Sequence, residues 1–264
     1  MSKIDEVFQK LRSEGKKAFM PFITAGDPSL EMTSQLISQF NDIGCHLCEV
    51  GIPYSDPIAD GPVIQASYTR ALDQGVNLSG ILETIGGCSN RITMPVITMV
   101  SYAIVYRRGL KEYVERAKAA GVSGAIVPDL LIEEADEFAE ICRQADFSLI
   151  QLVTPTTPRE RAIRIAESTT GFIYYVSVTG ITGERTSLPA ELTDNVSWLK
   201  EQTDLPICIG FGISQPSHIE LLKPVCDGMI VGSAIVKHMT SQKPDGEILQ
   251  DVREYASGLL DAVN

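Results

Sequence analysis

The sequence lacks a long hydrophobic run. No uninterrupted apolar stretch in its 264 residues approaches the roughly 18 residues that a membrane-spanning helix requires. The opening residues, MSKIDEVFQKLRSEGKK, are charged and contain no apolar region of the kind that a signal peptide needs. We therefore expect no membrane association and a cytoplasmic location.

Positive charge is also scarce. The chain has 22 lysine and arginine residues against 34 aspartate and glutamate residues, which gives a formal net charge of -12 and a pI near 4.7. Such a charge repels nucleic acid phosphates and anionic membrane surfaces, so neither is expected as a partner. An anionic substrate would have to be held by local backbone amides rather than by the overall field.

Thiol, imidazole and metal chemistry have few candidate residues. The six cysteines are spread along the chain without the spacing of a disulfide framework, which suits a reducing compartment. Cys45 and Cys48 form a C-x-x-C pair, but side chains three positions apart in a strand point to opposite faces, and the sequence has no second pair. His46, His218 and His238 fall in no pattern with a serine or cysteine nucleophile. We predict no metal site.

The chain does have a regular alternation of segments. Short apolar runs alternate with amphipathic ones almost from end to end, which favours a parallel sheet covered by helices on both faces. Eight such units in about 250 residues predict an α/β fold, the (β/α)8 TIM barrel, with a doubly wound sheet as the alternative. We expect one domain over 1–264, with additional N- and C-terminal helices at 3–14 and 246–262. The predicted strands are 18–25, 45–51, 95–101, 124–129, 148–153, 171–178, 206–212 and 227–233.

Glycine-bearing turns follow the last three predicted strands. They are TGITGERTS (179–187), GFGIS (210–214) and VGSAIV (231–236). In such a barrel the loops after strands seven and eight often bind phosphate, because glycine lets backbone amides approach and a helix N-terminus adds positive potential. A simple chain reversal is the alternative for any one of these glycines. The first turn is longer and polar, and we expect it to act as a flap.

Carboxylates gather after the second predicted strand, in the stretch EVGIPYSDPIADGP (49–62). Because side chains alternate between faces, Leu47 and Glu49 would share the inward face, with Glu49 near the carboxyl end of the barrel. Asp60 follows in the loop, and two carboxyl groups in different environments can divide acid and base roles. Capping a turn or helix is the alternative for Asp56 and Asp60, and the favoured one for Asp56.

An apolar pocket is expected at the same end of the barrel, since binding pockets are mostly lined by apolar and aromatic side chains. Most apolar residues of the strands belong to the core, and only their position near strand ends distinguishes the candidates. These are Phe22, Val100, Tyr102, Leu152, Tyr174, Phe211 and Ile230.

Five segments together resemble the tryptophan synthase alpha subunit. They occur in that family's order and spacing over nearly the whole chain, and the second is the most specific. The resemblance implies a lyase of tryptophan biosynthesis that cleaves indole-3-glycerol phosphate by a retro-aldol reaction to indole and D-glyceraldehyde 3-phosphate. The segments are PFITAGDP (21–28), EVGIPYSDPIADGPVIQ (49–65), SVTGITGER (177–185), GFGIS (210–214) and GSAIVK (232–237).

The resemblance also implies roles for individual residues. Glu49 matches the general acid–base of the family, Asp60 the carboxylate that pairs with the indole N–H, and Thr182 the flap threonine that orders Asp60. Other positions match the phosphate site (Gly183, Phe211, Gly212, Gly232 and Ser233) and the indole pocket (Phe22, Tyr102 and Tyr174).

A protein partner is implied as well. Members of the family pair with a beta subunit, so the resemblance implies an alpha2beta2 heterotetramer in which pyridoxal phosphate is bound by the beta subunit and no cofactor by this chain. Pro53, Asp56 and Pro57 match the loop that contacts this partner, to which indole would pass through a tunnel. Ile104 and Leu131 depart from the residues that many members have near the interface.

Three alternatives differ in function. An isomerase or epimerase of a sugar phosphate would keep the phosphate loops but not the 49–62 segment. A stand-alone indole-releasing lyase would have no partner. A regulatory subunit would activate a beta subunit without catalysis, and the intact Glu49 and Asp60 argue against it.

Overall fold

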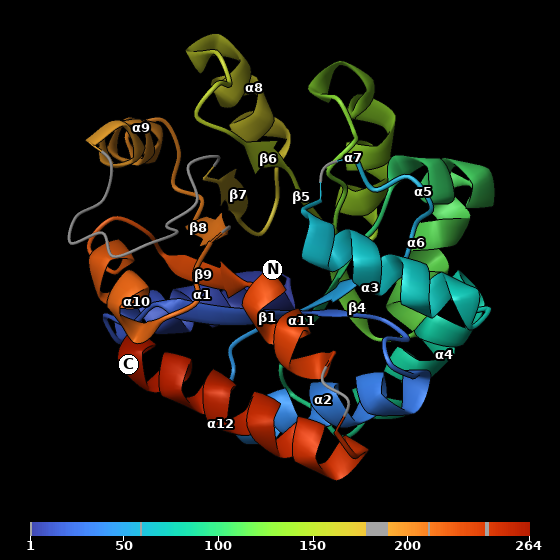
Figure 1. Ribbon diagram of the computed structural model, residues 1–264. Coiled ribbons are helices and arrows are strands. Elements are labelled where there is room, and N and C mark those ends of the chain that lie inside the picture. The colour runs from blue at the N-terminus through green and yellow to red at the C-terminus, as the bar shows by residue number, and fades with distance from the viewer. Residues whose placement is uncertain (1, 59, 178–189, 211, 241–242) are drawn as a thin grey trace.

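All eight predicted strand positions carry strands, and these pair in parallel around a barrel (Figure 1). The computed structural model describes residues 2–58, 60–177, 190–210, 212–240 and 243–264. Neighbouring strands follow the order β5-β4-β3-β2-β1-β9-β8-β7-β6, so the doubly wound alternative is wrong and the TIM barrel is confirmed. The strands are β1 Ala18–Thr24, β2 Cys48–Gly51, β3 Val96–Met99, β4 Val122–Ile126, β5 Ser148–Ile150, β6 Leu152–Val153, β7 Ile173–Val176, β8 Ile207–Gly210 and β9 Gly228–Val231.

The predicted strand over 148–153 is divided into two. Residues of β5 pair with β4, whereas β6 pairs with β7, and only Gln151 separates them. The carbonyl of Gln151 accepts a hydrogen bond of 3.1 Å from the amide of Tyr174 in β7. The chain thus changes its hydrogen-bonding partner strand at Gln151. Because β5 and β6 are the two ends of the strand order, this residue joins them and closes the barrel.

Helices cover the outside of the barrel, and one of them, α1, crosses the end at which the strands begin. Their starts follow the expected capping chemistry: Ser2 and Asp5 form a reciprocal capping box at α1, and the Ser29 hydroxyl accepts the Met32 amide at α2. The helices are α1 Lys3–Ser13, α2 Leu30–Asp42, α3 Pro62–Asp73, α4 Leu78–Ser89, α5 Tyr102–Arg108, α6 Leu110–Ala119, α7 Asp136–Gln144, α8 Arg159–Ser168, α9 Ala190–Lys200, α10 Pro216–Leu222, α11 Ser233–Met239 and α12 Asp245–Val263, with a 3-10 turn η1 at Ile132–Glu134.

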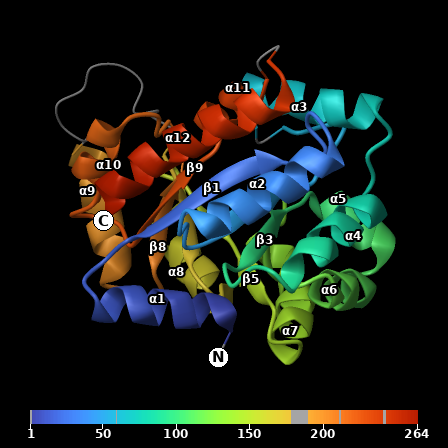
Figure 2. The same ribbon diagram turned by 90° about the horizontal axis from the view of Figure 1, so that it is seen from below.

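The two additional helices occupy the predicted positions. Helix α1 closes the amino-terminal end of the barrel, where Phe8 packs against Phe172 with ring centroids 5.7 Å apart. Helix α12 runs alongside α10, α11 and α2 (Figure 2). Because α1 seals the lower end with apolar side chains, access to the barrel interior is from the carboxyl ends of the strands. In the described part of the chain no helix is both long enough and apolar enough to cross a membrane.

Candidate active site

Glu49 is the central polar group of the barrel. It lies in β2 opposite Phe22 of β1 and Ile97 of β3, and only 1% of it is exposed. Strand alternation directs it inward, whereas Cys48 and Val50 pack in the layer between the sheet and the helices. Both of its carboxyl oxygens are buried and have no hydrogen-bond partner among the described residues. An unpartnered buried carboxyl group is costly, so it needs a reason other than stability.

The electrostatics of Glu49 follow from this position. Burial, together with the nearby charge of Asp60, raises the pKa of Glu49 to about 8. The carboxyl group is therefore mainly protonated at neutral pH and can donate its proton. A residue with this property at the carboxyl end of a barrel strand is suited to general acid catalysis.

Asp60 lies at the end of the loop that follows β2. Its amide donates to the Pro57 carbonyl at 3.2 Å, and its own carbonyl accepts the Gln65 side-chain amide at 2.8 Å. The helix that follows is capped by Gly61 without any side-chain bond, so neither Asp56 nor Asp60 caps α3. Burial raises the pKa of Asp60 to about 6, which leaves it mainly ionised at neutral pH.

Asp56 has a different environment from Asp60. It is exposed and accepts a hydrogen bond of 2.7 Å from its neighbour Ser55. The two aspartates of the loop therefore separate into an exposed one and a half-buried one that is close to Glu49.

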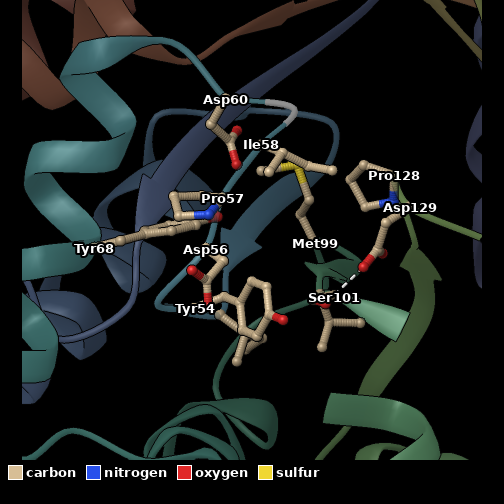
Figure 3. Close-up of a pocket in the computed structure, with 12 residues that line it drawn as sticks. Tyr54, Asp56, Pro57, Ile58, Asp60, Tyr68, Met99, Ser101, Pro128 and Asp129 are labelled. Atoms are coloured by element: carbon tan, nitrogen blue, oxygen red, sulfur yellow. Dashed lines mark hydrogen bonds between the residues drawn. The ribbon is translucent and has the colours of Figure 1, made fainter. Parts of the chain in front are cut away.

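A cleft opens beside Asp60 and encloses about 360 Å³, part of it open to solvent (Figure 3). Asp60 lies on one side of it, and Ser101, hydrogen-bonded to Asp129 at 2.6 Å, lies on the other. Of the predicted pocket residues, Val100 lines this cleft. The lining residues are Ile52, Tyr54, Asp56, Pro57, Ile58, Asp60, Tyr68, Met99, Val100, Ser101, Pro128 and Asp129.

The other predicted pocket residues divide into two groups. Phe22, Leu152, Tyr174 and Ile230 belong to the core clusters of the barrel and are not among the residues that line the cleft. Tyr102 lies outside the lining, because its ring packs against Tyr106 with centroids 5.9 Å apart. Phe211 lies outside the described residues.

The predicted phosphate positions are described only in part. Gly232 is the residue before α11 and Ser233 is the first residue of that helix. Gly212 has φ +79°, a conformation that glycine adopts readily. Gly183, Phe211 and the flap residue Thr182 lie outside the described residues.

Two features of the site escaped the sequence interpretation. Tyr68 of α3 lines the cleft, and Asp129 accepts the Ser101 hydroxyl and the Tyr102 amide at 2.6 and 2.7 Å, which holds the start of α5. A signal existed for Tyr68, because Ile64, Tyr68 and Ala71 follow helical spacing behind Asp60. Asp129 falls within the predicted strand over 124–129, but β4 ends at Ile126, so Asp129 lies in the loop that follows.

These features define the class of the protein. A parallel barrel that carries an inward protonated carboxyl group and a neighbouring ionised one at the carboxyl ends of its strands is a TIM-barrel enzyme equipped for acid–base chemistry. In the described part of the chain no group of three or more histidine, cysteine, aspartate or glutamate side chains is arranged to hold a metal ion.

Comparison with known proteins places the chain within that class. The family model "Tryptophan synthase alpha chain" matches residues 8–264. A tryptophan synthase alpha chain of Rhodopirellula baltica is 57% identical over 246 residues, 90% of this chain and 87% of the relative. One of Microcystis aeruginosa is 42% identical over the full length of both. The chain belongs to the tryptophan synthase alpha chain family.

Solved structures agree with this assignment. The tryptophan synthase subunit alpha of Legionella pneumophila superposes with a TM-score of 0.91 at 33% identity, covering 100% of this chain and 98% of that one. A chain of the tryptophan synthase a2b2 complex of Pyrococcus furiosus superposes with a TM-score of 0.87 at 36% identity, covering 93% and 99%.

Proposed function

We propose that Glu49 and Asp60 carry the reaction of this family in this chain. The alpha chain of tryptophan synthase is a lyase that cleaves indole-3-glycerol phosphate to indole and D-glyceraldehyde 3-phosphate. The observation that carries the residue assignment is the burial of Glu49 close to the half-buried Asp60. Both carboxyl oxygens of Glu49 lack a hydrogen-bond partner among the described residues.

In the proposed mechanism Glu49 acts twice, first as an acid that donates a proton and then as a base that accepts one. Its protonated carboxyl group donates to C3 of the indole ring, and the ring nitrogen then carries a positive charge that the Asp60 carboxylate stabilises through the ring N–H. The Glu49 carboxylate next takes the proton of the glycerol hydroxyl. The C–C bond breaks, its electron pair returns to the indole ring, and the new carbonyl leaves as glyceraldehyde phosphate.

The substrate's ends are assigned to separate parts of the barrel mouth. The phosphate is proposed to bind the amides around Gly212, Gly232 and Ser233, together with Gly183 and Phe211, where glycines permit close approach. The indole ring is proposed to lie among apolar residues at or near the strand ends, namely Phe22, Val100, Leu152, Tyr174 and Ile230, and to reach Tyr102 at the start of α5. Thr182 is proposed to order Asp60 from the flap.

The partner is proposed to cover the cleft mouth. The Pyrococcus furiosus relative is described as part of an a2b2 complex. In the described part of this chain the large exposed apolar residues are Ile58, Tyr106 and Leu131, at 89%, 70% and 53% exposure. Ile58 lies in the partner loop next to Asp56 and Pro57, and such exposed apolar groups favour an interface. The complex is proposed to be alpha2beta2.

The remaining assignments follow from this role. Pyridoxal phosphate is proposed to be bound by the beta subunit and no cofactor by this chain. All described strands join one barrel, which supports a single domain over 1–264. The proposed location for this biosynthetic step is the cytoplasm.

Indole release from indole-3-glycerol phosphate tests the residue roles. Purified wild-type chain, without a beta subunit, should release indole, whereas Glu49→Gln and Asp60→Asn should lose at least about 100-fold in rate. The control is Glu201→Gln, which changes an exposed carboxylate that does not line the cleft and should keep the wild-type rate in this assay. A Glu49→Gln variant with more than about a tenth of the wild-type rate would remove Glu49 from the mechanism.

Addition of a beta subunit separates the alternatives. Activation of tryptophan formation without indole release by the alpha chain would favour a purely regulatory subunit, and indole release unaffected by any beta subunit would favour a stand-alone lyase.

A further inference from the structure

Tyr68 carries a phenol hydroxyl to the mouth of the barrel. Helix α3, which begins directly after Asp60 and Gly61, turns Tyr68 toward the strands, and only 3% of this residue is exposed. The helix is anchored at two points: Ser67 and Thr24 of β1 share a hydrogen bond of 2.6 Å, and Arg70 binds Asp27 through two bonds of 2.9 and 2.7 Å. The approach of Tyr68 to the barrel is therefore set by fixed contacts.

The hydroxyl of Tyr68 occupies space that a glycine leaves open. A Cβ atom at Gly51 would lie 2.7 Å from this hydroxyl oxygen and 2.5 Å from the Cζ atom of Phe22. Gly51 follows Glu49 by two positions in β2, so both face inward, and Gly51 is about 6.6 Å nearer the mouth. The phenol hydroxyl thus lies above Glu49, at the level where a substrate entering the barrel meets the two carboxyl groups.

Asp60 faces the same space from the loop. Tyr68 and Asp60 both line the cleft, and Figure 3 shows the Tyr68 ring extending from α3 beneath Pro57 into it. Burial raises the pKa of Tyr68 well above its usual range, and the charges of Asp60 and then Glu49 raise it further. The phenol therefore keeps its proton at neutral pH and is a hydrogen-bond donor that faces the same space as the ionised Asp60.

We infer that Tyr68 is a positioning residue whose hydroxyl donates a hydrogen bond to the Asp60 carboxylate when substrate is bound. One carboxylate oxygen then accepts a hydrogen bond from the phenol and the other accepts one from the indole N–H. The negative charge of Asp60 is thereby held next to the ring nitrogen. This inference rests on the proposed function and adds a residue to it. The simpler role, apolar packing alone, would be served equally by phenylalanine, which makes the two roles separable.

Tyr68→Phe removes only the hydroxyl oxygen. We expect kcat to fall by about 10- to 100-fold, as for the loss of a hydrogen bond to a charged group, with KM and glycerol 3-phosphate binding within about twofold of wild type. The acidic limb of the pH–rate profile should move to higher pH, because a donated hydrogen bond favours the ionised form of Asp60. The matched control is Tyr113→Phe, which removes the hydroxyl of a buried tyrosine bound to Thr98 at 2.7 Å in the layer outside the sheet, and should leave that limb in place.

A second measurement does not depend on turnover. The Asp60 carboxyl carbon can be titrated by NMR with glycerol 3-phosphate and indole bound, in a Glu49→Gln background that removes the other titrating carboxyl group. The titratable groups that face this space are Glu49 of β2, the carboxyl groups of Asp56 and Asp129, and the phenols of Tyr54, Tyr68 and Tyr174. Burial keeps the phenols of Tyr68 and Tyr174 protonated by raising their pKa values. Adding Tyr68→Phe should raise the Asp60 midpoint by about one pH unit.

The outcomes distinguish the two proposals. If wild type releases indole but Tyr68→Phe changes neither the acidic limb nor the Asp60 midpoint, Tyr68 only packs and the inference is wrong. If wild type releases no indole, the proposed function fails, and the Asp60 titration alone then decides whether the phenol holds this carboxylate.

Discussion

Replacing Glu49 by glutamine should make the protein more stable and inactive at the same time. The amide keeps the size and shape of the carboxyl group but has no proton to transfer. In the wild type, Glu49 has a pKa of about 8 in the folded state, against 4.5 for an unperturbed glutamate. The folded state therefore keeps a proton that the unfolded state releases between these two values.

The sign and size of the effect follow from this difference. Below about pH 4.5 both states are protonated and Glu49 does not penalise folding. As the pH rises toward 8, the unfolded state gains about 1.4 kcal/mol per pH unit from releasing its proton, so wild-type stability falls by about 5 kcal/mol in all. The glutamine variant lacks this loss. Its advantage in free energy of unfolding should grow through that window and stay constant above it.

Urea unfolding followed by circular dichroism measures this advantage. Wild type and Glu49→Gln are compared at several pH values, so that titrating groups that do not interact with position 49 cancel in the difference. The control is Glu201→Gln, which changes an exposed glutamate and should give a difference that does not vary with pH. A constant difference for Glu49→Gln as well would refute the idea that Glu49 is buried as an unpaired acid.

Four further outcomes are expected. The indole-release rate should follow a bell-shaped pH profile, with limbs near 6 and 8 from the two carboxyl groups, and a profile without an acidic limb would contradict the division of roles. Gly51→Ala should slow cleavage and lower the free energy of unfolding by about 1–3 kcal/mol, because its Cβ would lie 2.5 Å from the ring of Phe22; urea unfolding checks this. Arg70→Gln should cost about 3 kcal/mol in the same measurement by leaving Asp27 buried without its ion pair, and adding Asp27→Asn should restore part of that loss. Gly232→Val should weaken glycerol 3-phosphate binding by at least about 10-fold in calorimetry while the protein still folds, since its Cβ would meet Phe22 only at 3.5 Å; unchanged affinity would move the phosphate site elsewhere.

The sequence by itself determined the barrel and the inward position of Glu49. Both depend on local periodicity: apolar strands of period two separated by amphipathic helices allow few arrangements, and a residue two positions from Gly51 in a strand must share its face. The glycine turns and the 49–65 segment could be recognised for the same reason, because their information lies within a short stretch of chain.

Only the tertiary structure decided which distant side chains meet. Tyr68 reaches the space above Gly51 because α3 is held by the Ser67–Thr24 hydrogen bond and the Arg70–Asp27 ion pair. Asp129, which follows β4, holds the start of α5. Such contacts depend on the angle and separation at which a helix packs on the sheet, and no local pattern encodes these quantities. The same holds for the pKa of Glu49, which is set by burial among strands from several parts of the chain and by the charge of a loop aspartate.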